Sequence, residues 1–112
     1  NEVVQLHRLL SSEAAELFLP QSVDFIYLDA NHSTESVGLD LRSWWPKLKP
    51  GGIFAGHDYL PGNGKGYGVK PAVDAFASRM NLPVHQTTEE YCRDSGVYGR
   101  AWEGCSFVLR KE

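Results

Sequence analysis

The strongest constraint on the fold of this chain is a pair of apolar segments that an amphipathic segment joins. Each apolar segment ends in ionisable side chains. The first segment, residues 23–28, is followed by Asp29, and the second, residues 53–56, is followed by His57 and Asp58. Between them, apolar residues recur at the spacing of one helix face, at Val37, Leu41, Trp44 and Leu48. A strand–helix–strand crossover is right-handed and leaves its two strands parallel. The pattern therefore predicts an α/β sheet in which both strands end at one edge.

Local signals predict where this crossover unit begins and ends. Residues 23–28 form a near-continuous apolar run, as expected for a strand that is covered on both faces. Ser33 or Thr34 can cap the helix that follows. Pro46 and the Pro-Gly-Gly run at 50–52 should end that helix before the second strand. Of the two tryptophans at its end, we expect one in the core and one at the surface or in an interface.

The remaining segments predict smaller elements on either side of the crossover. Residues 3–10 fit a strand or a helical turn equally well. Ser11 or Ser12 can cap a helix over residues 13–18. A later helix, with Pro71 in its first turn, has one apolar face made of Val69, Val73, Phe76 and Met80. Two short strands are expected last, at residues 83–86 and 105–110.

Composition limits the classes of partner and compartment. With 112 residues, the chain has the size of one domain, and its net charge of -3 argues against a basic nucleic-acid surface. No apolar run approaches the roughly 18 residues that a membrane span needs. Cys92 and Cys105 lack the spacing of metal ligands and fit reduced thiols. We therefore expect a cytoplasmic protein that binds neither nucleic acid nor membrane.

The polar residues at the two strand ends form the candidate site. Ligands of open α/β sheets bind outside the carboxyl ends of the strands, which makes Asp29, His57 and Asp58 neighbours there. Two carboxylates and an imidazole suit a divalent ion such as Mg²⁺ or Mn²⁺, which would lower the pKa of a bound hydroxyl. Alternatively, Asp29 is a turn or capping residue. His32 can join the site or only cap the next helix, and His57 can be a ligand, a base or a hydrogen-bond partner.

Alternating glycines mark the segment after the second strand, at positions 62, 64, 66 and 68. A phosphate-binding loop requires Gly-Lys followed by Ser or Thr, but Lys65 is followed by Gly66. No Gly-x-Gly-x-x-Gly fingerprint occurs either. We therefore interpret the segment as an active-site lid, from which Lys65 and Tyr67 can contact substrate.

Several of these motifs together resemble a known family. They are the strand ending in Leu-Asp-Ala-Asn-His at 28–32, the turn Leu-Lys-Pro-Gly-Gly at 48–52, and Gly-His-Asp-Tyr at 56–59. The chain resembles the class I S-adenosylmethionine-dependent methyltransferases, in particular their small-molecule O-methyltransferase branch. The resemblance covers about residues 11–112.

The resemblance implies a fold and a set of site residues. The family sheet has strand order 3-2-1-4-5-7-6 with strand 7 antiparallel, and this chain matches strands 4, 5, 6 and 7. The expected fold is thus a Rossmann-like half-fold with a mostly parallel sheet, in the order 4-5-7-6. In metal-dependent relatives, Mg²⁺ is held at the positions of Asp29 and Asp58, and His57 stands where those relatives often have an acidic or amide ligand. The catalytic base would be Asp29 or His57.

The glycine-rich strand–turn–helix that approaches the cofactor in this family has no counterpart before Asp24. We therefore expect residues 1–112 to form a single methyltransferase-like domain without the N-terminal cofactor-binding half, and its cofactor-binding residues stay unassigned. An uncovered strand edge should make the chain self-associate as a homo-oligomer, such as a dimer. The leading function is O-methylation of a small molecule, with the domain inactive alone. The alternatives are a non-catalytic oligomerisation module and a divalent-metal-dependent hydrolase that uses Asp29, His32, His57 and Asp58.

Overall fold

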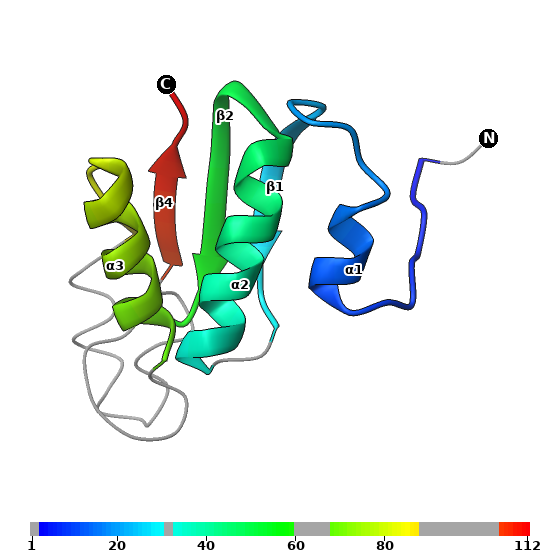
Figure 1. Ribbon diagram of the computed structural model, residues 1–112. Coiled ribbons are helices and arrows are strands. Elements are labelled where there is room, and N and C mark those ends of the chain that lie inside the picture. The colour runs from blue at the N-terminus through cyan, green and yellow to red at the C-terminus, as the bar shows by residue number, and fades with distance from the viewer. Residues whose placement is uncertain (1–2, 31–32, 60–67, 88–105) are drawn as a thin grey trace.

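A computed structural model describes residues 3–30, 33–59, 68–87 and 106–112. In chain order the elements are α1 (Ser11–Ala15), β1 (Val23–Leu28), α2 (Thr34–Trp44), the 3₁₀ turn η1 (Trp45–Lys47), β2 (Leu48–His57), α3 (Val69–Met80), β3 (His85–Gln86) and β4 (Ser106–Arg110). Figure 1 shows their arrangement. The expectations for His32, Lys65, Tyr67, Cys92 and Cys105 lie outside the described residues.

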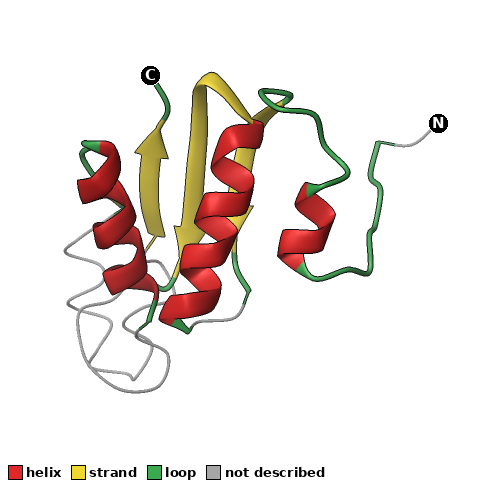
Figure 2. Cartoon of the chain, in the orientation of Figure 1, coloured by secondary structure: helices red, strands yellow, loops and turns green. Residues whose placement is uncertain are grey.

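The four strands form one sheet in the order β1-β2-β4-β3. β1 and β2 are parallel, and β4 runs antiparallel to β2 (Figure 2). The short strand β3 pairs antiparallel with β4. With β1, β2, β3 and β4 in the places of family strands 4, 5, 6 and 7, this is the order 4-5-7-6 with an antiparallel strand 7. The predicted α/β half-fold is confirmed.

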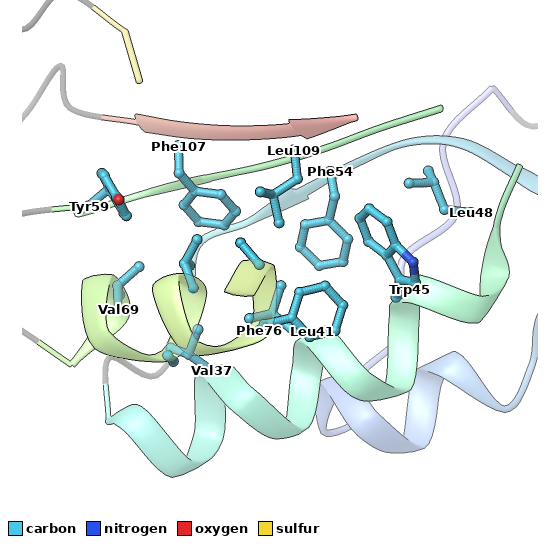
Figure 3. Close-up of a cluster of buried hydrophobic side chains, with 13 residues drawn as sticks. Val37, Leu41, Trp45, Leu48, Phe54, Tyr59, Val69, Phe76, Phe107 and Leu109 are labelled. Carbon is cyan, nitrogen blue, oxygen red and sulfur yellow. The ribbon is translucent and has the colours of Figure 1, made fainter. Parts of the chain in front are cut away.

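One hydrophobic core holds α2 and α3 against the sheet. Val37 and Leu41 of α2, and Val73 and Phe76 of α3, belong to one buried cluster with Phe54 of β2 and with Phe107 and Leu109 of β4. Figure 3 shows this cluster between the helices and the strands. The rings of Phe54 and Phe107 stack with centroids 6.4 Å apart. Trp45 lies in this core, and its ring is 5.3 Å from that of Phe76. These contacts fix the crossover that makes β1 and β2 parallel.

The opposite face of β1 is open, contrary to the expectation of a strand covered on both faces. Side chains alternate along the strand, so that Ile26 and Leu28 pack against the core while Phe25 and Tyr27 point the other way. Phe25 is 56% exposed and Tyr27 48%. The reason is architectural, because α2 and α3 cover the same face of the sheet (Figure 1).

The first helix, predicted over residues 13–18, differs in its start, its end and its cap, since α1 is Ser11–Ala15. α1 begins at Ser11 after the N-cap Leu10, so Ser11 and Ser12 lie inside the helix. The side chain of Glu13 supplies the capping contact instead, because the backbone amide of Leu10 donates to its Oε1 at 3.2 Å. From residue 3 up to this cap the backbone forms neither the strand nor the helical turn considered above.

The other helices and strands lie where the sequence predicts them, but several of their ends differ. Ser33 caps α2 by accepting from the amide of Ser36 at 3.1 Å. Leu48 is buried as predicted, but it belongs to β2 because η1 separates it from the helix. β2 is longer than residues 53–56, and β3 is shorter than residues 83–86. Met80 does not join the apolar face of α3, because it is 45% exposed in the last turn.

Among the described residues, no helix is long and apolar enough to cross a bilayer.

Of the two tryptophans at the end of α2, Trp45 is the one in the core, as expected for one member of the pair, since it is 7% exposed. Trp44 is half-buried and donates from Nε1 to the carbonyl of Ser11 at 2.9 Å. This bond ties α1 to the crossover helix.

Asp40 of α2 is a buried carboxyl at 6% exposure, and burial raises its pKa above the ordinary value of 3.8. A raised folded-state pKa gives stability that is present below pH 3.8 and is lost as the pH rises through the folded value. We therefore expect Asp40→Asn to be more stable than the wild type at pH 7, with the difference shrinking toward pH 4 (about the ordinary Asp value). Thermal unfolding between these pH values measures it. A less stable variant at pH 7 would contradict this account, and Asp24→Asn at an exposed position is the control.

The open edge and face of β1 predict self-association. Uncovered strands pair with other chains, and a lysine on the edge opposes such pairing. Size-exclusion chromatography with light scattering should show a dimer or larger species at micromolar concentration, and Phe25→Lys should shift it to the monomer. Leu39→Lys, at a position 45% exposed on α2, should leave the assembly unchanged. A wild-type chain that is only monomeric would refute the prediction.

Candidate active site

The structure brings Asp29, His57 and Asp58 together at one edge of the sheet. Leu28 and Gly56 are paired neighbours on parallel β1 and β2, so the residues that follow them emerge side by side. Each of the three side chains offers one ligand atom, and these atoms lie within 4.8 Å of one another. Asp29 is exposed, whereas His57 and Asp58 are partly buried. The predicted proximity of the two aspartates is therefore present, while their chemical roles stay predictions.

Gly56 allows β2 to carry His57 so close to its neighbours. A Cβ at this position would overlap the ring of Phe107 on β4 and would lie 2.7 Å from the carbonyl oxygen of Leu28 on β1. Only a glycine therefore fits between the two flanking strands without a shift of the sheet. The sequence marked Gly56 as part of a family motif, but the steric reason depends on β4, which lies some fifty positions along the chain.

The chain turns sharply directly after His57. Asp58 has a φ of 62°, in the left-handed region that non-glycine residues seldom adopt. Its Oδ1 lies 3.1 Å from Nδ1 of His57, and the two side chains are 23% (His57) and 16% (Asp58) exposed. The turn thus directs the Asp58 carboxylate back toward the imidazole instead of into solvent.

Tyr59 anchors this turn to α3. Its side chain is buried at 6% exposure, and its hydroxyl donates to Oδ1 of Asp74 at 2.5 Å. Nζ of Lys70 donates both to the Tyr59 hydroxyl and to Oδ2 of Asp74, each at 3.1 Å. The same Nζ lies 4.4 Å from the centre of the Tyr59 ring. The segment that bears His57 and Asp58 is therefore held at its far end as well.

Burial raises the pKa of the Tyr59 hydroxyl, and the hydrogen bond to Asp74 adds to that effect. For Lys70, burial lowers the pKa, but the hydrogen bonds to Tyr59 and Asp74 outweigh it, so the pKa is raised. Both groups therefore keep their protons at neutral pH, and the network persists there. The sequence did not single out Lys70 or Asp74; their only signal was an i, i+4 charge pair on the helix after the turn.

An open groove lies along β1 and reaches Asp29. It has a volume of about 460 Å³, and residues of α1, of β1 and the side chain of Trp44 line it together with Asp29 and Ala30. Neither His57 nor Asp58 lines this groove. A small molecule with an apolar body and a polar group could lie here with the polar group at Asp29.

The donor set fits a divalent cation. Two carboxylates supply hard oxygen ligands, and the imidazole supplies a nitrogen that borderline divalent ions accept. Asp29 directly follows β1, His57 is the last residue of β2 and Asp58 directly follows it, so the ends of two neighbouring strands hold the set. The residues can therefore hold an ion with three protein ligands and leave positions for substrate oxygens or water.

Fold and site together define a class I methyltransferase domain: an α/β sheet with the family's strand order, an antiparallel strand beside β2, and acidic residues at two adjacent strand ends. Residues 1–59, more than half of the chain, match a family described as a methyltransferase domain. The chain belongs to this methyltransferase domain family.

Solved structures share the fold at low sequence identity. A crystal structure of a protein from Corynebacterium glutamicum aligns with a TM-score of 0.63 and 13% identity, over 90% of this chain and 44% of that one. A protein from Bordetella parapertussis, titled a possible exported protein, aligns with a TM-score of 0.56 and 12% identity, over 88% of this chain and 42% of its own. The chain thus spans less than half of each. No curated protein matches its sequence significantly.

The Tyr59 network predicts a local stability effect. Tyr59→Phe keeps the buried ring but removes the hydroxyl between Asp74 and Lys70, so we expect a loss of about 1–2 kcal/mol in the free energy of unfolding. Tyr27→Phe removes a hydroxyl that bonds Ser106 Oγ at 3.0 Å in an exposed setting and should cost less than that. Urea denaturation of both variants measures the difference. Equal losses would show that the network contributes nothing specific.

Proposed function

We propose that this domain supplies the acceptor side of an S-adenosylmethionine-dependent methyltransferase that methylates a hydroxyl group of a small molecule. The observation that carries the proposal is the placement of Asp29, His57 and Asp58 within reach of one another at the carboxyl ends of two parallel strands. Family membership supports the reaction class, and the groove that ends at Asp29 supports a small acceptor.

The chemistry follows from what these residues can do. Asp29 or His57 would accept the proton of the acceptor hydroxyl at this edge of the sheet. S-adenosylmethionine, when bound, would supply a sulfonium methyl group for transfer to the deprotonated oxygen, with the neutral thioether as the leaving group. A divalent ion held by Asp29 and Asp58 would lower the pKa of the hydroxyl. The larger contribution of the domain is positioning and exclusion of water.

Each side chain has a distinct part in this scheme. Asp29 is the exposed donor and can reach a ligand in the groove. His57 and Asp58 are less exposed and contact each other, so they form the fixed side of the site. Tyr59 touches neither ligand nor metal in this scheme and acts by holding the turn.

Calorimetry with S-adenosylmethionine, with and without Mg²⁺, tests the proposal on the full chain. We expect binding in the micromolar range that Mg²⁺ strengthens, and Asp29→Asn should weaken the Mg²⁺-dependent part by about tenfold or more. Asp24→Asn is the matched control on the same strand, because Asp24 pairs with Lys49 at 3.1 Å on the surface and should not affect binding.

The other outcomes decide between the alternatives. No binding of cofactor or metal, together with a tight oligomer, would refute the proposal in favour of a non-catalytic association module. Metal binding without cofactor binding would refute it in favour of a metal-dependent hydrolase. Cofactor binding that Asp24→Asn weakens as much as Asp29→Asn would place the binding site elsewhere on the sheet.

A further inference from the structure

We infer that His57 makes this site selective for first-row transition ions such as Co²⁺ over Mg²⁺. The inference deepens the proposed function and rests on the same site. Its starting point is the donor set, in which an imidazole accompanies two carboxylates and the three ligand atoms lie within 4.8 Å of one another. A site with oxygen ligands alone would instead suit a hard ion such as Mg²⁺.

The imidazole is held in place and cannot easily leave the site. His57 is the last residue of β2, where it is paired with Ser106 of β4. Gly56 before it is wedged between Leu28 and Phe107, and Asp58 after it turns back to contact Nδ1. An ion bound between Asp29 and Asp58 therefore meets the His57 ring as a neighbour.

The spacing of the donors suits a small octahedral divalent ion. In octahedral coordination with bonds of about 2.1 Å, adjacent ligand atoms lie about 3.0 Å apart. Nδ1 of His57 and Oδ1 of Asp58 are 3.1 Å apart, which is close to this separation. Asp29 is exposed and can adjust its side chain to complete a third position.

The identity of the donors sets the selectivity. Mg²⁺ is a hard ion that binds oxygen ligands and loses its water reluctantly. An imidazole suits later divalent ions, whose affinity for mixed nitrogen and oxygen sites rises from Mn²⁺ to Co²⁺ and beyond. We therefore expect the order Mg²⁺ below Mn²⁺ below Co²⁺ at this site, with His57 as the cause of the difference.

Calorimetric titration of the untagged full chain with CoCl₂ and with MgCl₂ tests this. Co²⁺ should bind about 100-fold more tightly than Mg²⁺, and His57→Asp should reduce that ratio by about tenfold or more. His85→Asp, a change of the same kind at an exposed position on β3, should leave the ratio unchanged. An equal ratio in wild type and His57→Asp, or no binding of either ion, would overturn the inference.

A second measurement does not depend on the fold of a variant. In the wild-type chain, the diamagnetic ion Zn²⁺ should shift the NMR signals of the His57 ring, while those of His85 stay unchanged. Equal shifts of both rings would overturn the inference. Binding of S-adenosylmethionine with equal affinities for Co²⁺ and Mg²⁺ would overturn it and leave the proposed function intact. Selective Co²⁺ binding without cofactor binding would support it and refute the methyl-transfer proposal.

Discussion

The packing of α2 and α3 onto one face of the sheet is the constraint on which the site depends. Leu41 and Phe54, both fully buried, belong to the hydrophobic cluster that joins the crossover helix α2 to β2. While this packing is intact, β1 and β2 remain parallel and their carboxyl ends remain at the same edge. Loss of the packing would separate Asp29 from His57 and Asp58 without any change in those residues.

The antiparallel strand β4 supplies the second constraint. Its Phe107 packs over Gly56, which sets how closely β2 approaches its neighbour just before the site. Beyond the site, Tyr59 joins the turn to α3 through Asp74. The segment with His57 and Asp58 is thus held on both sides by elements that lie later in the chain, and a rigid pair of donors is the result.

In the described part of the chain, α2 and α3 both cover one face of the sheet, and the side chains of β1 on the other face are exposed (Figure 1). Phe25 and Tyr27 remain exposed beside a groove that ends at Asp29. The solved structures with the same fold are more than twice as long as the part that matches this chain.

The sequence by itself determined the crossover unit and the meeting of Asp29 with Asp58, because hydrophobic periodicity and strand-end residues are local signals. The strand order followed from the family resemblance and not from these signals. It placed the start of α1, the length of β2 and the exposure of Met80 wrongly, since caps and helix ends depend on what packs nearby. Only the tertiary structure decided that one face of β1 stays open and that Gly56 must be a glycine. It also decided that Lys70 and Asp74 support Tyr59. Each of these depends on contacts between residues distant in the chain, and no pattern in a single segment encodes such contacts.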